Sequence, residues 1–360
     1  MIDAVVPKAG DVTAGATRLR AGRAPALPLS SWKLVAVAAT VAVTVAACGS
    51  GAGSTAADIP GPTSAVVTPT DVAGLVDIGA GRSVYLECRG SGAPTVVLMA
   101  GKGNSAREWH QIIDPADPAH QSPGDDVGGG LVPQFDSETA VFPSVSRFTR
   151  VCAYDRPDTR LEGVDRSTPR AQPHSVSLDV SDLHALLAAS GEPGPFVLVA
   201  HSYSGFIAEL YTRTYPADVA GLVLVDPGSQ AIEKVASPTA LVTWDRLQRA
   251  TSGASPEGIE ALDAFQRIDS APPMPSIPTT ILSADKPWGT DPAAAGPVGT
   301  GTLTFDDWLA AQSLLATQLG AKHVSDTGSG HHVYLYSPEL VTVEVATMVD
   351  AVNETARAAT

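Results

Sequence analysis

Ser202 lies where one hydrophobic pattern ends and another begins. Residues 196–200 are apolar without interruption, which is typical of a strand buried on both faces of a parallel sheet. After the serine, apolar residues recur at helical spacing from Phe206 until Pro216 interrupts the pattern. So sharp a turn presents a hydroxyl at a helix N-terminus, where free N–H groups and the helix dipole stabilise a developing oxyanion. Ser202 is therefore a candidate nucleophile, and the alternative is a serine that merely caps the helix.

The residues around this serine resemble a nucleophile elbow. Residues 200–204 read Ala-His-Ser-Tyr-Ser, which is similar to the G-x-S-x-G elbow of the α/β-hydrolase superfamily, with other small residues at both glycine positions. The resemblance implies an α/β-hydrolase fold, a mostly parallel eight-stranded sheet with helices on both faces and a small helical cap. It also implies a Ser-His-Asp triad, in which a histidine takes the proton of Ser202 and a carboxylate holds that histidine.

The base of this family follows the last strand of the sheet. Residues 328–332 read Gly-Ser-Gly-His-His, and Pro-Glu-Leu follows at 338–340, which resembles the family's S-G-H…P-E-L ending. The resemblance implies that His331 is the base, with His332 as the alternative. A serine hydroxyl is a poor nucleophile near neutral pH, so the base has to reach within hydrogen-bond distance of it.

Two aspartates are candidates for the triad acid. Asp226 directly follows the strand pattern of residues 221–225, where some members of the family carry their acid. Asp285 follows the next strand pattern, at 279–284, about two residues earlier than the family's usual position. The sequence leaves both open, and the carboxylate outside the triad is expected to order its loop.

Backbone N–H groups are expected to stabilise the oxyanion. Residues 100–109 resemble the family pattern H-G-x-G-x-S-x-x-x-W, with Ala100 in the place of the histidine. The resemblance implies that the N–H groups of Lys102 and Tyr203 form the oxyanion hole. Because these donors belong to the backbone, the missing histidine need not disable the hole.

A second loop near the site also resembles the family. Residues 154–157 read Tyr-Asp-Arg-Pro, and Asp158 follows where the family has glycine. The resemblance implies that Asp155 and Arg156 order this loop and take no part in the chemistry. His174, at the start of the helix that comes next, is interpreted as structural.

From residue 71 onward, strand patterns alternate with helical patterns, which predicts a mainly parallel sheet covered on both faces. The sequence predicts strands at 75–78, 83–88, 95–99, 151–154, 196–200, 221–225, 279–284 and 322–326. It predicts helices at 176–187, directly after Ser202, at 305–319 and at 341–352. The region 229–275 breaks the alternation with two helical stretches and resembles the family's cap. Residues 71–360 are therefore expected to form one hydrolase domain.

Composition limits the classes of function. The chain has 360 residues, of which 44% are apolar, and this is ample for a buried core. The formal net charge of −15 at pH 7 argues against a nucleic-acid partner. The acidic residues within 114–130 fit no calcium-binding loop, and this insertion is expected to shape the entrance to the site. We expect neither a metal nor a cofactor.

The N-terminal region is expected to direct export. Basic residues precede residues 34–47, which carry no charge and would form a helix too short to span a bilayer. Residues 45–48, Val-Ala-Ala-Cys, resemble a bacterial lipobox. This implies a lipoprotein signal peptide at 1–47, lipidation of Cys48 and a location on the outer face of the cell membrane, the alternative being an ordinary cleaved export signal. Residues 48–70, rich in Gly, Ser, Thr, Ala and Pro, are expected to be a flexible tether.

Cys88 and Cys152 each lie in a strand-like pattern. In the family's strand order the second and fourth strands are neighbours, so the resemblance implies a disulfide between them. The environment of an exported protein permits this bond. The alternative is two buried thiols.

Together these features predict a lipid-anchored serine hydrolase that acts on a small-molecule ester or other acyl compound. Ser202 would form an acyl-enzyme, and water activated by His331 would release the acyl group. The same scaffold serves cofactor-free haloperoxidases and perhydrolases, which are one alternative. A non-catalytic binding lipoprotein is the other.

Overall fold

The computed structural model describes residues 71–113, 134–159, 163–251, 256–287 and 303–358. All of them belong to one unit of the chain, Ala65–Thr360. The expected signal peptide, lipidation site and tether, and the insertion at 114–130, lie outside the described residues. Among the described residues, no helix is both long and apolar enough to cross a membrane.

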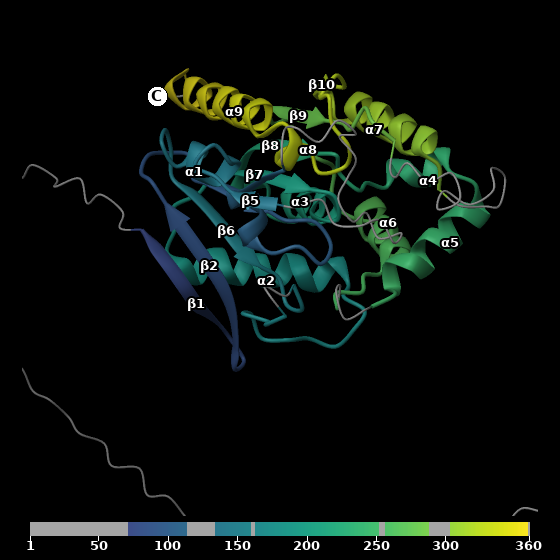
Figure 1. Cartoon of the computed structure of the whole chain (residues 1–360), viewed down its shortest axis with the longest axis horizontal. Coiled ribbons are helices and arrows are strands. Elements are labelled where there is room, and N and C mark those ends of the chain that lie inside the picture. Colours follow the sequence, from purple (N-terminus) through teal and green to yellow (C-terminus); the bar gives the residue numbers. More distant parts are fainter. Residues whose placement is uncertain (1–70, 114–133, 160–162, 252–255, 288–302, 359–360) are drawn as a thin grey trace, which may run out of the picture. The chain divides into compact units, whose positions relative to one another are not determined.

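The described residues form an eight-stranded sheet with the order β1-β2-β6-β3-β7-β8-β9-β10 (Figure 1). Its strands are β1 (Val72–Gly79), β2 (Arg82–Arg89), β3 (Val96–Met99), β6 (Val151–Asp155), β7 (Phe196–His201), β8 (Val219–Val225), β9 (Thr279–Leu282) and β10 (Lys322–Val324). β2 is antiparallel to both of its neighbours, and every neighbouring pair from β6 to β10 is parallel. This is the mostly parallel sheet of an α/β-hydrolase fold, as the sequence predicts.

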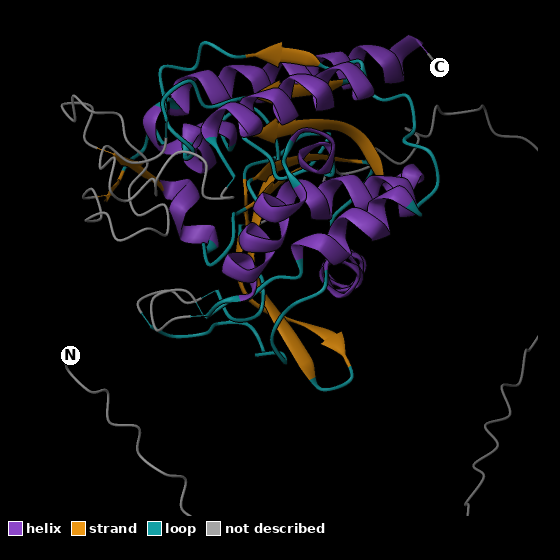
Figure 2. Ribbon diagram, turned by 90° about the vertical axis from the view of Figure 1, so that its right-hand side faces the viewer, coloured by secondary structure: helices purple, strands orange, loops and turns teal. Residues whose placement is uncertain are grey.

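Helices cover both faces of the sheet, with α2 on one side and α9 on the other (Figures 1 and 2). The helices are α1 (Val141–Val145), α2 (Val176–Ser190), α3 (Ser204–Thr214), α4 (Ala231–Val235), α5 (Pro238–Arg249), α6 (Ala261–Asp269), α7 (Phe305–Leu319), α8 (Val333–Tyr336) and α9 (Pro338–Ala358). Two short 3-10 helices are η1 (Ala106–His110) and η2 (Pro216–Asp218). A separate two-stranded sheet pairs β4 (Gln111–Ile113) with β5 (Gln134–Asp136).

The central strands are apolar throughout because both of their faces are buried. In β7, Leu198 and Ala200 belong to the core that includes side chains of α2, α3 and α7. Val197 and Val199 point the other way, into the core that includes side chains of α1, α8 and α9. Since the strands from β6 to β10 are parallel, the loops that follow them gather at one edge of the sheet, where such folds place their sites.

The sequence does not predict η1, β4, β5, α1 or α8, each of which has five residues or fewer. Segments this short hold too few residues to show a helical or strand period. The predicted long elements differ from the observed ones mainly at their ends. The final helix, for example, begins at Pro338 and continues to Ala358.

The described part of residues 229–275 contains three helices, α4, α5 and α6, where the sequence shows two helical stretches. Trp244 and Phe265 stack with their ring centroids 6.0 Å apart. Phe265 also lies 5.7 Å from Phe206, which belongs to α3. This region therefore packs on the helix that directly follows Ser202 (Figure 1).

A disulfide joins Cys88 in β2 to Cys152 in β6, with an S–S distance of 2.08 Å. The two residues are direct partners in the antiparallel register of these strands. The bond closes a loop with a sequence separation of 64 residues. In a chain-entropy model, closing such a loop stabilises the folded state by about 4 kcal/mol.

Candidate active site

Ser202 occupies a tight turn between β7 and α3. Its φ is +52°, in the left-handed region that residues other than glycine rarely adopt. Its N–H donates to the carbonyl of Val225 at 3.2 Å, and its carbonyl accepts from the N–H groups of Gly205 and Gly228 at 2.9 and 2.8 Å. These bonds hold a backbone conformation that costs about 1–3 kcal/mol. The position of the hydroxyl is thereby fixed above the sheet.

The close backbone approach that this turn requires occurs at Gly205. A Cβ at this residue would lie 2.6 Å from both the carbonyl oxygen of Gly228 and Cβ of Pro227. Ser204, which stands where the family has its second glycine, is fully buried, and its hydroxyl donates to the carbonyl of Ala100 at 2.6 Å. The serine at this position thus joins the elbow to the loop that follows β3.

Ser202, His331 and Asp226 form a continuous chain of hydrogen bonds. His331 Nε2 lies 2.9 Å from Ser202 Oγ, and His331 Nδ1 lies 2.6 Å from Asp226 Oδ2. Asp226 is fully buried, and its Oδ1 accepts the N–H of Ala284 and the indole N–H of Trp308, both at 3.0 Å. Because the carboxylate accepts from Nδ1–H, Nε2 is left to accept the serine proton.

The other candidate acid, Asp285, has a different set of partners. Its carboxylate oxygens accept the N–H groups of Ser329 and Gly328 at 2.8 and 3.0 Å. It therefore orders the turn that carries His331. The alternative base, His332, lies at the start of α8, with its ring centroid 5.4 Å from that of His331.

His201, the last residue of β7, is a site residue that the sequence does not single out. Its buried imidazole donates from Nε2 to the carbonyl of His331 at 3.0 Å. Burial, together with the nearby imidazoles of His331 and His332, holds the pKa of His201 well below its usual range. The ring therefore supports the backbone of His331 without adding a charge beside it.

The loop after β3 brings Lys102 close to Ser202. A Cβ on Gly101 would lie 2.7 Å from His201 Nδ1 and 3.2 Å from Ser202 Cβ, so the backbone before Lys102 packs directly on the elbow. The Lys102 side chain extends toward the end of α5, where Nζ lies 3.3 Å from the carbonyl oxygen of Ala250. The loop thus presents its backbone to the serine and its side chain to residues 229–275.

Tyr203 adjoins Ser202 from the helix side. Its phenol donates to Asp179 Oδ2 at 2.5 Å, and the face of its ring lies against the Arg156 guanidinium, whose Cζ is 5.4 Å from the ring centroid. Burial and the negative charge of Asp179 raise the pKa of Tyr203 well above its usual range, so the phenol stays protonated. The side chain is therefore directed into the body of the protein.

A buried ion pair lies behind these loops. Arg156 is 3% exposed and Glu257 is inaccessible, and Arg156 Nε donates to Glu257 Oε1 at 2.8 Å. Burial alone would raise the pKa of Glu257, but the charge of Arg156 lowers it to about 2. The sequence assigns Arg156 to loop ordering. The sequence does not single out Glu257; its second helical pattern within 229–275 begins at residue 256, but α6 begins only at Ala261 and leaves Glu257 outside the helix.

Within the described residues, one group of possible metal ligands lies close together, Cys88, Cys152 and Glu192. The two sulfur atoms of this group are joined in the disulfide. They offer no thiolate to a metal ion, because a thiolate is the form of cysteine that binds metals.

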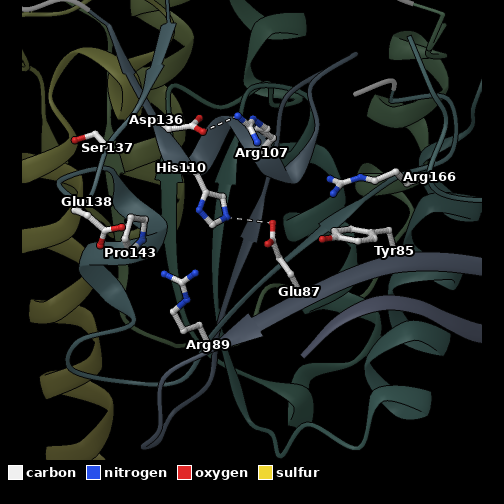
Figure 3. Close-up of a pocket in the computed structure, with 10 residues that line it drawn as sticks. All are labelled: Tyr85, Glu87, Arg89, Arg107, His110, Asp136, Ser137, Glu138, Pro143 and Arg166. Atoms are coloured by element: carbon white, nitrogen blue, oxygen red, sulfur yellow. Dashed lines mark hydrogen bonds and ion pairs between the residues drawn. The ribbon is translucent and has the colours of Figure 1, made fainter. Parts of the chain in front are cut away.

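A polar hollow of about 370 Å³ opens beside β2 and η1 (Figure 3). Arg107 and Asp136 pair across it at 2.5 Å, and His110 lies 3.2 Å from Glu87. The residues that line it do not include the hydrogen-bonded group around Ser202. Because its lining is mostly charged and polar, the hollow offers little to an acyl chain.

Residues 128–343, more than half of the chain, match the model of the Alpha/beta hydrolase family. The chain therefore belongs to the α/β-hydrolase family. Ser202 and Asp226 directly follow β7 and β8, and His331, which is hydrogen-bonded to both, lies in the loop after β10.

Known proteins share parts of the sequence. Lipase LipV from Mycobacterium tuberculosis is 39% identical over 114 residues, which cover 29% of this chain and 43% of that protein. An uncharacterized protein of Schizosaccharomyces pombe is 33% identical over 152 residues, or 41% of this chain and 26% of that protein. The chain thus spans less than half the length of these curated relatives. Among solved structures, an esterase from Thermogutta terrifontis superposes with a TM-score of 0.46 at 17% identity, over 79% of this chain and 99% of that one.

Proposed function

We propose that the protein is a serine hydrolase that cleaves an ester or other acyl compound through an acyl-enzyme at Ser202. The observation that carries this proposal is the continuous hydrogen bonding from Ser202 through His331 to Asp226. Membership of the α/β-hydrolase family supports hydrolase chemistry, and one relative is named a lipase. A strained backbone at Ser202 adds support, because strain of this kind gathers at functional sites.

In the proposed reaction, Ser202 Oγ attacks the carbonyl carbon of the substrate while His331 Nε2 takes the hydroxyl proton. Asp226 stabilises the resulting imidazolium through Nδ1. The backbone N–H groups of Lys102 and Tyr203 donate to the oxyanion. His331 then gives its proton to the leaving group as the bond to the carbonyl carbon breaks. A water molecule, deprotonated by His331, attacks the acyl-enzyme and frees the serine.

Residues 229–275 are proposed to be the cap that shapes the acyl-binding site. Their support is the packing of Phe265 on Phe206, in the helix that follows Ser202. The contact of Lys102 Nζ with the carbonyl of Ala250 brings the same region to the proposed oxyanion loop. A cap in this position would set the acyl length that the enzyme accepts.

The proposed location is the outer face of a bacterial cell membrane. Residues 1–47 would be the signal peptide, Cys48 the lipidation site, and 48–70 a tether to the hydrolase domain at 71–360. The lipobox-like Val-Ala-Ala-Cys supports this, as does the Cys88–Cys152 disulfide, since such bonds persist in oxidising compartments.

Metabolic labelling with palmitate in a bacterial host tests the proposed location. The wild type should carry the label and sediment with membranes, and Cys48→Ala should lose both properties. An unlabelled wild type, or equal labelling of the two proteins, would contradict a lipid anchor at Cys48.

Hydrolysis of a chromogenic short-acyl ester tests the proposed chemistry. The wild type should turn the ester over, and His331→Ala should lower kcat/KM at least about a thousandfold. His332→Ala is the matched control and should stay within about tenfold of the wild type, because its ring is not the one bonded to Ser202. Equal activity of His331→Ala and the wild type would refute the assignment. Peroxide-dependent halogenation without ester turnover would favour the haloperoxidase alternative.

A further inference from the structure

The proposed oxyanion donor, the N–H of Lys102, shares a peptide group with the carbonyl of Gly101. Arg156 Nη2 donates to that carbonyl oxygen at 2.5 Å. A peptide group is planar and trans, so its N–H points away from its C=O. Holding the Gly101 carbonyl therefore fixes the direction of the Lys102 N–H.

The Arg156 guanidinium uses each of its five N–H donors in this region. Nη1 donates to the carbonyl of Ala100 at 2.6 Å and to the hydroxyl of Ser204 at 3.0 Å. Nε and Nη2 donate to the two carboxylate oxygens of Glu257 at 2.8 and 3.0 Å. With the bond to Gly101, these contacts leave the planar group a single orientation.

Glu257 holds the loop on the other side of Lys102. Its Oε2 accepts the N–H of Gly103 at 2.5 Å, so the peptides before and after Lys102 are bonded to one ion pair. Glu257 is fixed in turn, because the N–H of the next residue, Gly258, donates to Gln172 Oε1 at 2.7 Å. The oxyanion loop thus depends on a residue from the proposed cap.

A buried ion pair is a poor source of stability, because the cost of removing two charges from water offsets much of their attraction. The geometry of the Arg156–Glu257 pair, by contrast, is well suited to holding the peptide groups on both sides of Lys102 in position. A charged donor on the Gly101 carbonyl also polarises that peptide and makes its N–H a stronger donor.

We propose that Arg156 and Glu257 are positioning residues for the oxyanion hole, and that they set the direction and donor strength of the Lys102 N–H. This role rests on the serine hydrolase function proposed above. It also accounts for Ser204, whose hydroxyl accepts from Arg156 and donates to Ala100, at a position where the family has glycine.

Arg156→Lys tests this role, because lysine keeps the charge and loses the planar fork. With the chromogenic ester, kcat should fall ten- to a hundredfold while KM changes less than about threefold, since the oxyanion bond strengthens in the transition state. A boronic acid, which forms a tetrahedral adduct with the serine, should bind more weakly by a similar factor. The product carboxylic acid should bind the two proteins equally.

Arg150→Lys is the matched control. Arg150 is also buried, pairs with Glu192 at 2.7 Å and donates to the carbonyl of Gly90 at 3.1 Å, but it precedes β6 whereas Arg156 follows it. The same chemical change at the opposite end of the strand should leave kcat and boronate affinity within about twofold of the wild type. A parallel loss in both variants would assign the effect to general stability and overturn the positioning role.

Glu257→Gln provides a second test of the positioning role, and this test still applies if Arg156→Lys does not fold. The glutamine side chain has the same shape as glutamate but no charge. Both kcat and boronate affinity should therefore fall at least about tenfold in this variant. Unchanged values in a folded variant would overturn the role of the ion pair while the wild-type turnover still supports the proposed function. A wild type that turns over no acyl ester and binds no boronate would remove both proposals together.

Discussion

The imidazole of His201 donates to the carbonyl oxygen of His331 at 3.0 Å. The residue directly before Ser202 thus holds the backbone of the histidine whose ring is hydrogen-bonded to Ser202. The two histidines are 130 residues apart in the sequence. The carbonyl can only accept, so His201 Nε2 carries a proton. A neutral His201 serves this contact best, because a second positive charge would oppose the imidazolium that His331 forms in the proposed reaction.

Stability should depend on pH through His201. In the unfolded chain its imidazole takes up a proton as the pH falls through about 6.5, whereas the buried imidazole, whose pKa is lowered, resists protonation. The contribution of His201 to the free energy of unfolding should therefore be greatest above about pH 6.5 and decline below it. His201→Gln removes this titration and should show a smaller decline between about pH 7 and pH 5 in urea unfolding.

Comparing the wild type with His201→Gln isolates the contribution of His201 to the pH dependence of stability. His174 acts in the opposite sense: burial alone would lower its pKa, but the nearby carboxylates of Glu257 and Asp179 outweigh burial and raise it. The contribution of His174 is present in both the wild type and His201→Gln, so it cancels in the difference between their unfolding free energies. Equal declines in the wild type and His201→Gln would show that His201 is not the group responsible.

The two candidate acids should differ sharply in kinetics. Asp226→Asn removes the charge that stabilises the imidazolium and should lower kcat/KM about a thousandfold or more. Asp285→Asn replaces one of the two oxygens that accept the N–H groups of Ser329 and Gly328, and should lower kcat/KM less than about tenfold while costing about 1 kcal/mol of stability. Steady-state ester kinetics measure the first effect and urea unfolding the second. The reverse ranking would make Asp285 the acid.

Glu108 should make the protein less stable at high pH. Burial raises its pKa to about 6, although hydrogen bonds from Tyr334 and Asn104 oppose the shift. A carboxyl whose folded pKa is raised contributes less stability as the pH increases from about 4.5 through 6. Both bonds reach Oε2, so the amide oxygen of Glu108→Gln can replace that acceptor without a buried charge.

Glu108→Gln should therefore exceed the wild type in stability by about 1–2 kcal/mol near pH 8 and match it near pH 4. Urea unfolding at the two pH values measures the difference. A wild type that is more stable than Glu108→Gln near pH 8 would show that the fold stabilises the ionised carboxylate of Glu108, and would contradict this prediction.

The sequence predicts the elements that carry the serine because their patterns are long. The apolar run before Ser202 and the helical pattern after it each cover enough residues to show their period. The choice between Asp226 and Asp285 is different, since both follow a strand and spacing alone does not give the direction of a side chain. That direction depends on tertiary contacts, such as the Trp308 indole that holds Asp226.

The supporting residues are harder to predict for a related reason. Glu257 lies at the start of the second helical pattern within 229–275, before α6 begins at Ala261, and it meets Arg156 across 101 positions of the sequence. His201 occupies a variable position of the elbow pattern, where no residue type is specified. The role of each arises from a contact that only the folded chain creates.

Labelling with a fluorophosphonate, followed by mass spectrometry of the intact protein and its peptides, tests the central claim most directly. The reagent reacts with serines that a neighbouring base activates and stops at a stable adduct on the oxygen. The wild type should gain one adduct located at Ser202, Ser202→Ala should gain none, and His331→Ala should react far more slowly. A folded wild type that stays unmodified, or carries its adduct on another residue, would contradict Ser202 as the nucleophile.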